Sequence, residues 1–495
     1  MATEQHSGSR RIVVVGSGIA GLAAAYRLQE RCEQDGPPCE VRVLEAAARP
    51  GGAISTTHRD GFVLESGPDT IFTDKPWGLD LIRRLGLSEQ VIGTNEAHRR
   101  TFVVRDGALH PLPEGFALMG PTKPWPFLQS GLLSWRGKAR AALDLVLPRG
   151  GPSDDESLAS FVRRRFGQEF LDRLAQPMIG GIYGADPERL SLRATFPQFL
   201  QMEATHRSVI LGLRRMRPAG RGVGHTSSGP RYGLFVTLDH GLQALVDAMV
   251  KRLPAGTLRL RAPVDRIAHT EQGWTVRLGD GASLQADGLI LAVPAFEIAR
   301  LTHDLDQDLA RQLEAMPYAS SVTINLAYRR EAIHHPLDGF GFVVPACEGR
   351  TIIACSFSSV KFAHRAPAGH VLLRAFAGGA LQPEPFTWDD ETLLSAVRRD
   401  LEELLAIHAP PLWSQLVRHP RVMPQYQVGH LGRLAALEET LRRWPTLKLT
   451  GNAYRGVGVP DVVHSGETAA DSLLAELAPS PTEPTPACTE GDSRL

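Results

Sequence analysis

A glycine-rich turn near the start of the chain is the feature that most constrains its fold. Residues 16–21 read GSGIAG and lie between an apolar stretch at 11–15 and an Ala- and Leu-rich stretch at 21–34. The first stretch predicts a strand, and the second has the apolar spacing that is typical of a helix. A further strand is predicted at 41–45, ending at Glu45. This βαβ unit predicts an α/β fold built on a parallel sheet.

The three glycines of this turn fit the binding of a dinucleotide. Gly16 permits the tight turn, Gly18 lets the main chain approach a pyrophosphate, and Gly21 lets the helix pack closely on the strand. The helix N-terminus adds amide donors and the positive end of its dipole. A carboxylate at Glu45 can accept hydrogen bonds from ribose hydroxyls, which favours FAD or NAD over NADP. Without this context, the alternative is a turn that binds no ligand.

The composition is that of a globular protein with more than one core. The chain has 495 residues, of which 43% are hydrophobic and 22% charged, so we expect two or three subdomains. Lys plus Arg and Asp plus Glu each number 54, a balance that gives no reason to expect a nucleic-acid partner. The polar start predicts no signal peptide, and no apolar run reaches the roughly 18 residues of a membrane-spanning helix.

The cysteines and histidines suggest neither a disulfide framework nor a metal centre. The five cysteines form no C-x-x-C pair and are odd in number, and the 17 histidines show no metal-ligand spacing. We therefore expect no metal and a reducing compartment, with the protein in the cytoplasm or peripheral to the cytoplasmic membrane.

Two further motifs distinguish FAD from NAD. Residues 49–52 (RPGG) resemble the R-x-G-G segment of the flavin amine oxidase superfamily, although Ala53 stands where that family usually has a second Arg. Residues 449–461 (LTGNAYRGVGVPD), followed by a helix from His464, resemble its C-terminal FAD signature. The resemblance implies FAD bound at both ends of the chain. The residues implied to hold it are Gly16, Ser17, Gly18, Ile19, Ala20, Gly21, Glu45, Ala46, Arg49, Gly51, Gly52, Gly67, Pro68, Asp69, Thr70, Val264, Asn452, Val457, Gly458 and Val459.

Longer segments narrow the resemblance to the protoporphyrinogen oxidases within that superfamily. Residues 176–197 (QPMIGGIYGADPERLSLRATFP) and 423–430 (MPQYQVGH) resemble family segments of the same spacing, and the likeness extends from about residue 11 to 474. It implies an α/β fold with three parts. These are a Rossmann-like FAD-binding domain of the amine-oxidase type, a mixed α/β substrate domain and a helical membrane-contacting domain.

The same resemblance implies a substrate pocket for a tetrapyrrole. Gly181 is implied to lie beside the carbon that is oxidised, and Val343, Ser356 and Phe376 to enclose the rings. Ser356 departs from the usual Leu, which predicts a wider or more polar pocket. From the residues alone, ordinary core packing is the better interpretation of Val343 and Phe376.

The position that often supplies a propionate-binding Arg in this family is also different. Thr101 occupies it, and Arg100 precedes it. Arg100 is our candidate for the missing charge, since Arg favours bidentate carboxylate recognition, with an ordinary surface Arg as the alternative.

The resemblance implies an oxygen-using FAD enzyme that oxidises protoporphyrinogen IX to protoporphyrin IX for heme synthesis and forms hydrogen peroxide. Three two-electron steps remove six hydrogens, and we name no catalytic acid or base. Coproporphyrinogen III is an alternative substrate within the same family. A homodimer is an alternative to a monomer. A flavin amine oxidase is the nearest alternative. A noncatalytic relative such as a Rab GDP dissociation inhibitor is a more distant one.

We expect this order of parts along the chain: FAD-binding segments at 1–94, 218–300 and 421–477, a mainly helical membrane-contacting and substrate region at 95–217, a β-rich substrate region at 301–420, and a disordered tail at 478–495. The helical region carries Trp125, Phe127, Leu132, Leu133 and Trp135 near basic residues. This pattern suits a helix on a membrane surface, and equally a helix core with a solvated basic face.

Overall fold

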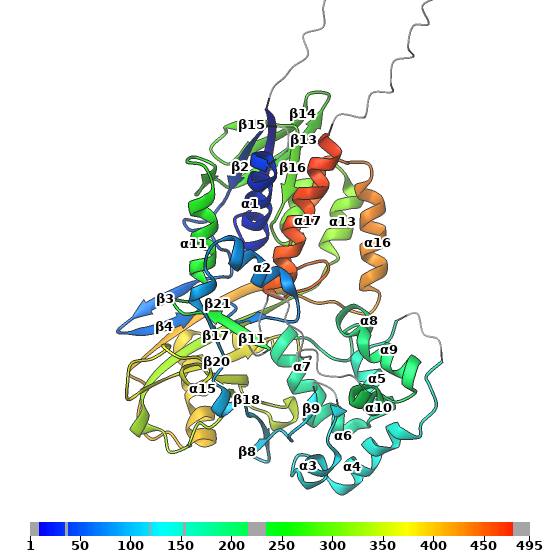
Figure 1. Ribbon diagram of the computed structural model, residues 1–495, viewed down its shortest axis with the longest axis vertical. Helices are drawn as coiled ribbons and strands as arrows, with labels where there is room; N and C mark the ends of the chain where they lie inside the picture. Colours follow the sequence, from blue (N-terminus) through cyan, green and yellow to red (C-terminus); the bar gives the residue numbers. More distant parts are fainter. Residues whose placement is uncertain (1–8, 35–37, 118–119, 152–154, 216–233, 479–495) are drawn as a thin grey trace, which may run out of the picture.

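The structure is a computed structural model that describes residues 9–34, 38–117, 120–151, 155–215 and 234–478. The loop expected at 218–231 and the tail from 479 lie outside these ranges. Figure 1 shows a parallel sheet with its helices at the top, a second large sheet at the lower left and a group of helices at the lower right.

The parallel sheet is built from strands that lie far apart in the sequence. Within the described residues it has five strands in the order β12-β2-β1-β16-β22, and every neighbouring pair is parallel. Side chains of β1 alternate between two cores, with Ile12 and Val14 on one face and Val13 and Val15 on the other. The strands are β1 (Arg10–Val15), β2 (Cys39–Leu44), β12 (Leu258–Arg259), β16 (Gly288–Leu291) and β22 (Leu447–Leu449).

Helices and a small sheet cover the two faces of the parallel sheet. One face is covered by helices from both ends of the chain, α1 (Ile19–Gln34), α2 (Pro76–Arg84), α11 (Gln243–Arg252) and α17 (Val459–Leu477). The other is covered by β13 (Val264–Thr270), β14 (Gly273–Leu278), β15 (Ser283–Ala286), α12 (Ala295–Thr302), α13 (Gln307–Glu314) and α16 (His430–Leu441). The predicted βαβ unit is confirmed.

The apolar pattern of residues 77–92 predicts a helix over that range, but the helix that forms is shorter. It ends at Arg84 as α2, because Gly86 adopts the left-handed conformation with φ 76°. Residues Ser88–Gln90 then form a short 3₁₀ turn before strand β6 (Val91–Gly93).

The second large sheet has one apolar and one polar face. Within the described residues its order is β21-β17-β20-β19-β18-β7-β8. One face packs against α15 (Asp390–Leu405) through an aliphatic and aromatic core. The opposite face carries Asn325, Ser356 and Arg374. The Asp-Gly pair at 106–107 predicts a hairpin turn within residues 102–112, and the structure forms this hairpin as β7–β8. The strands are β7 (Thr101–Arg105), β8 (Ala108–Pro111), β17 (Tyr318–Arg329), β18 (Gly341–Val343), β19 (Ile352–Phe357), β20 (His370–Gly378) and β21 (Trp413–Pro424).

Not all of the apolar residues expected at a membrane surface are exposed in the helical part. Phe127, Leu132 and Leu133 are buried in the core of this part, so they are not available to lipid. Trp125 and Trp135 are 67% and 72% exposed. The helices are α3 (Pro124–Gln129), α4 (Trp135–Ala142), α5 (Leu158–Arg165), α6 (Gln168–Phe170), α7 (Gln176–Tyr183), α8 (Leu192–Thr195), α9 (Pro197–His206) and α10 (Val209–Arg215).

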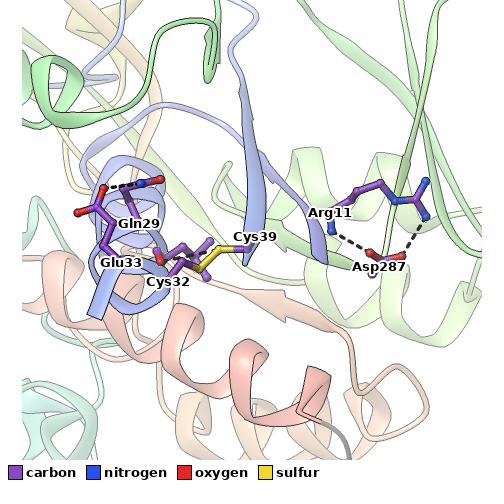
Figure 2. The surroundings of a disulfide bond; sticks show 7 residues. Arg11, Gln29, Cys32, Glu33, Cys39 and Asp287 are labelled. Carbon is purple, nitrogen blue, oxygen red and sulfur yellow. Dashed lines mark hydrogen bonds and ion pairs between the residues drawn. A yellow bond between two sulfur atoms is a disulfide. The ribbon is translucent and has the colours of Figure 1, made fainter. Parts of the chain in front are cut away.

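The expectation that the cysteines form no disulfide was wrong for one pair. Cys32 near the end of α1 and Cys39 at the start of β2 are joined by a disulfide, with 6.2 Å between their Cα atoms (Figure 2). A helix and the strand that follows it bring the two residues within bridging distance, although they are seven positions apart. Cys32 and Cys39 do not form a C-x-x-C pair, so the spacing of the cysteines gave no indication of this disulfide.

No helix within the described ranges is both long enough and apolar enough to cross a membrane.

Candidate functional site

The glycine turn after β1 has the geometry that a pyrophosphate needs. A Cβ at Gly16 would lie 2.7 Å from the carbonyl oxygen of Ala292, and one at Gly21 would collide with the carbonyl of Gly16. A Cβ at Gly18 would meet no atom within 4 Å. Packing therefore requires the first and third glycines, whereas Gly18 leaves the main chain open to a ligand.

Glu45 is aimed at this turn from the end of β2. Its Oε2 accepts hydrogen bonds from the main-chain N–H of Ser17 at 2.8 Å and from the Ser17 hydroxyl at 2.7 Å, and its Oε1 accepts from the N–H of Ala47. The carbonyl of Glu45 also accepts from Ala262, two residues before buried Val264 at the start of β13. The structure thus places Val264 beside the strand end that carries the acid.

The segment 49–54 packs directly on the glycine turn. The N–H of Gly51 donates to the carbonyl of Ser17 at 2.8 Å, and a Cβ at Gly52 would lie 3.2 Å from the Cα of Gly18. Arg49 donates to the carbonyls of Gly52 and Ile54, so its guanidinium holds its own turn. Arg49 therefore acts first as a structural clamp on this loop.

The segment 66–75 links these turns to the N-terminus of α17. A Cβ at Gly67 would collide with the carbonyl of Ala53, which places the turn 66–70 against the 49–54 loop. At its far end, Lys75 forms an ion pair of 2.6 Å with Asp461 in the first turn of α17. The segment 66–75 therefore connects the N-terminal glycine motif with the C-terminal one, although the two motifs lie nearly the whole chain apart in sequence. We call this connected set of turns the rim.

The N-terminus of α17 supplies a second set of amide donors. Gly458 precedes the helix without a side-chain cap, so the first-turn N–H groups are not used by its own cap. The N–H of Gly456 donates to the Tyr426 hydroxyl at 2.8 Å, which holds the loop before the helix. Two helix N-termini, an open glycine main chain and an acid for ribose fit FAD.

The residues expected to contact a tetrapyrrole are brought together from α7 and the polar face of the second sheet. Val343 pairs with Ala354, and Ala354 pairs with Phe376, so these side chains share a face with Ser356. A Cβ on Gly181 of α7 would lie 3.6 Å from Cγ1 of Val343. The hydroxyl of Ser356 donates to the carbonyl of Phe340 at 3.3 Å.

The side chain of Arg100 does not join this group of residues. Its side chain is 66% exposed and forms an ion pair of 2.9 Å with Asp338. Thr101 begins β7 and pairs with Gly341, at the edge of the sheet away from Phe376.

Three polar side chains that the sequence analysis did not single out hold the 65–67 main chain. Asn325 of β17 and His419 of β21 bond to successive carbonyls of this stretch at 3.2 and 2.9 Å, and Arg374 of β20 donates to the next. Burial lowers the pKa of His419 despite this bond. The sequence signal that could have indicated a buried charge is the arginine inside the mainly apolar run 370–378.

Asp69 completes this group as a buried carboxylate. Burial raises its pKa, but the positive charges of Lys361 and Arg374 outweigh that effect and hold it at about 2. The Lys361 ammonium donates to Asp69 at 3.1 Å. Lys361 was also not predicted, because it lies almost 300 residues from its partner in the chain.

Tyr183, the last residue of α7, lies near Tyr426, which holds the loop before α17. The rings of Tyr183 and Tyr426 are 6.5 Å apart and tilted by 54°. Burial, with Asp461 nearby, raises the pKa of Tyr183 to about 12, so it stays neutral at physiological pH. Among the described residues, no group of three or more His, Cys, Asp or Glu side chains is arranged to hold a metal.

The chain is similar to known proteins over almost its whole length. The chain is 35% identical to coproporphyrinogen III oxidase of Bacillus subtilis (strain 168) over 95% of its length and 99% of that protein. It is 33% identical to human protoporphyrinogen oxidase, over 94% of this chain and 98% of that protein. A crystal structure from Exiguobacterium sp. 255-15 that carries the name protoporphyrinogen oxidase matches with a TM-score of 0.84 and 32% identity, over 95% and 99% of the two chains.

The family model for flavin containing amine oxidoreductases matches residues 19–474. This match begins inside the first glycine motif and includes the whole second glycine motif and all of the second large sheet. Enzymes of this family carry FAD, the cofactor that the glycine turns and Glu45 fit. The chain therefore belongs to the flavin containing amine oxidoreductase family.

Proposed function

We propose that this protein oxidises a porphyrinogen to the corresponding porphyrin, with FAD as cofactor and molecular oxygen as the final electron acceptor. The observation that carries the proposal is the close approach of Gly181 in α7 to Val343, whose side chain shares a sheet face with Phe376. The end of α7 also lies near Tyr426, which bonds to Gly456 of the C-terminal glycine motif. The names of relatives at 33 to 38% identity support the same reaction class.

Coproporphyrinogen III is the first substrate to test, ahead of the protoporphyrinogen IX favoured by the sequence motifs. Relatives at 38% and 35% identity, from Propionibacterium freudenreichii and B. subtilis, are coproporphyrinogen III oxidases, and the human protoporphyrinogen oxidase is 33% identical. Coproporphyrinogen III has four propionates and protoporphyrinogen IX has two. A polar wall with Ser356 suits the more polar of these macrocycles.

The residues of the site position the macrocycle and exclude water. Bound FAD supplies a two-electron acceptor, which a porphyrinogen needs three times to lose six hydrogens. Val343 and Phe376 form the apolar part of the wall that also carries Ser356, and Gly181 lets the ring approach the main chain of α7 without a side chain between them. Holding the reacting carbon in one place is the main contribution such a wall can make.

The reaction needs no side-chain acid or base that we can identify. Tyr183 stays protonated because burial raises its pKa to about 12, and Asp69 is already bound by two cations. The proton released from a pyrrole N–H at each step passes to solvent. Overall, one porphyrinogen and three oxygen molecules give one porphyrin and three molecules of hydrogen peroxide.

We further propose a peripheral membrane contact through an exposed apolar patch, which we call the tryptophan patch. Lys138 of α4 donates to the carbonyl of Leu128 in α3, so the two helices present a common surface. Exposed Trp side chains beside basic residues are typical of proteins that bind a membrane interface. The patch consists of Trp125, Leu128, Trp135, Leu143 and Val146.

The membrane proposal is tested by sedimentation with anionic lipid vesicles. A variant with Trp125→Ser and Trp135→Ser should lose binding that the wild type shows. The control carries Leu381→Ser and Leu412→Ser, two exposed leucines outside the patch, and should bind as the wild type does. If the wild type does not sediment with vesicles, the patch has another role.

The oxidase proposal is tested by mixing FAD-loaded protein anaerobically with coproporphyrinogen III, protoporphyrinogen IX or a primary amine. We expect a porphyrinogen, and not the amine, to bleach the flavin absorbance, with porphyrin appearing after oxygen is admitted. Bleaching by the amine alone would replace the proposed reaction with amine oxidation.

A further inference from the structure

A buried charge cluster lies where the second sheet meets the turn 66–70. We call it the Asp69 cluster, and it consists of Asp69, Lys361 and Arg374. Lys361 and Arg374 approach the same carboxylate oxygen of Asp69 at 3.1 and 3.7 Å. The three side chains are only 19%, 16% and 4% exposed. Three charges this far from water are costly unless they have a role or are fully paired.

The cluster is not electrically neutral. Two cations face one carboxylate, and arginine stays protonated in proteins, so one positive charge is left over. Glu65 and Arg365 lie close by with opposite charges. Asp239 also acts on Arg365, and its carboxylate bonds to the exposed imidazole of His364 at 2.7 Å. The surplus therefore belongs to the three residues of the cluster itself. A surplus charge behind a protein wall is screened little by salt, so it acts over a longer distance than a surface charge.

The cluster also has hydrogen-bonding capacity that no described residue uses. Nε of Arg374 and Oδ1 of Asn325 are buried atoms without a hydrogen-bond partner, and the two residues are register partners on β20 and β17. Buried polar groups are normally hydrogen-bonded. A donor and an acceptor side by side match a ligand edge that offers both, as the carbonyl and N–H groups of a flavin ring do.

The position of the cluster relates it to the cofactor. Asp69 follows Gly67, which packs against the 49–54 loop and, through it, against the open main chain at Gly18. Arg374 donates to the Gly67 carbonyl and lies over the ring of Phe376, with 4.8 Å from its guanidinium carbon to the ring centre. The cluster therefore touches both the turn assigned to FAD and the wall assigned to the macrocycle.

We propose that the Asp69 cluster sets the reduction potential of the bound FAD, its surplus positive charge favouring the reduced flavin. This inference rests on the proposed FAD site, and it assigns to Lys361, Asp69 and Arg374 a tuning role that goes beyond binding. Reduction adds electrons to the flavin ring, and a fixed positive charge near the ring stabilises them. A higher potential makes each removal of two hydrogens from an electron-rich substrate more favourable.

The test is the flavin midpoint potential, measured by equilibration with a redox dye at pH 7.5 and without substrate. Lys361→Met removes a positive charge and should lower the potential, whereas Asp69→Asn removes a negative charge and should raise it. We expect each to change the ratio of reduced to oxidised flavin about tenfold, which is about 30 mV for a two-electron couple. Opposite signs are the signature of charge, because general loosening of the site would not produce them.

The double variant with both substitutions makes the test sharper. It retains the same net charge as the wild type, so its potential should return close to the wild-type value. Lys361→Arg keeps the charge and should leave the potential unchanged. Lys448→Met is the matched control, because Lys448 has similar exposure, 17%, and an acidic partner, Glu476, at 3.4 Å near the far end of α17.

Shifts of the same sign in the two single variants, or no shift in either, would overturn the proposal. If Lys361→Met fails to retain FAD, Asp69→Asn still decides, since a lowered or unchanged potential contradicts it. These outcomes are independent of the substrate. An enzyme that holds FAD but oxidises no porphyrinogen would refute the proposed function. The measured midpoint potentials would still decide whether the Asp69 cluster tunes the flavin. An active porphyrinogen oxidase with unshifted potentials would refute only this inference.

Discussion

The hydroxyl of Tyr426 accepts a hydrogen bond from the main-chain N–H of Gly456 at 2.8 Å. The same hydroxyl donates to the carbonyl of Asn452 at 2.6 Å. Tyr426 is 2% exposed and its ring stacks on His430 at 4.1 Å. One side chain of the 423–430 segment thus fixes the loop that leads into α17. This bond explains in physical terms why two sequence motifs almost thirty residues apart belong to one site.

Removing this hydroxyl should loosen the C-terminal half of the cofactor site. We expect Tyr426→Phe to lower the free energy of unfolding by about 1–3 kcal/mol, because it leaves a buried N–H and a buried carbonyl without partners. FAD should also dissociate faster. Urea denaturation and flavin release report the two effects, and Tyr328→Phe, another buried tyrosine in the second sheet, is the control for FAD release. Equal FAD release from both variants would contradict this role for Tyr426.

The glycines of the first turn should separate cofactor binding from folding. Gly18→Ala adds a methyl group where the described structure has open space, so the fold should persist while FAD is lost to the steric block. Gly21→Ala drives a methyl group into the Gly16 carbonyl and should destabilise the fold by about 1–3 kcal/mol or more.

Flavin absorbance per protein and the melting temperature of the apoprotein measure these two effects. Gly432→Ala, on α16 with no atom near its added Cβ, should keep FAD bound and should not lower the melting temperature, because Ala favours the helix more than Gly does. Full FAD occupancy in Gly18→Ala would show that the pyrophosphate does not lie at this turn.

Gly181 should matter for the substrate and not for stability. An added methyl group would meet Val343 at an ordinary contact distance of 3.6 Å, so the helix can accept it. The group would nevertheless displace a macrocycle that lies against the main chain of α7. We expect kcat/KM for the porphyrinogen to fall about 10- to 100-fold, since small misplacements of a reacting carbon have effects of this size.

As a control, the melting temperature and FAD content of Gly181→Ala are compared with those of the wild type, and both should be the same. Unchanged kinetics with Gly181→Ala would place the substrate elsewhere.

His419 should make stability depend on pH. Burial lowers its pKa in the folded state below the ordinary value of the unfolded chain, so the unfolded state binds more protons as the pH falls below about 6.5. Stability contributed by neutral His419 is therefore present above that pH and lost below it. His419→Gln keeps a donor for the Ser66 carbonyl but cannot titrate, so its urea midpoint should fall less between pH 7.5 and 5.5. A fall equal to that of the wild type would count against this assignment.

Much of the cofactor site could be predicted because its chemistry is local in sequence. Gly16, Gly18 and Gly21 fall within six residues, and Glu45 ends the next strand, so the βαβ unit fixes their relative positions. The resemblance added Gly181, Val343, Ser356 and Phe376, and the structure brings them to one wall. Their contacts with FAD and substrate stay predictions.

The rest depended on contacts that sequence spacing does not encode. Arg374 and Lys361 meet Asp69 only because β20 and the short helix α14 (Ser358–Lys361) lie beside the turn after β4 (Phe62–Glu65). Arg100 was chosen for its place beside Thr101, but its charge is exposed and paired with Asp338. The membrane pattern of the helical part mixed exposed Trp125 with buried Phe127, because periodicity alone does not say which face of a short helix is covered.

The most direct test of the central claim is aerobic turnover by purified, FAD-loaded protein, followed by porphyrin fluorescence and oxygen uptake. Coproporphyrinogen III and protoporphyrinogen IX are compared at equal concentrations. The account predicts porphyrin formation with three oxygen molecules consumed per porphyrin, and a faster rate with coproporphyrinogen III. No porphyrin above the uncatalysed rate from either substrate, with FAD bound in full, would contradict it.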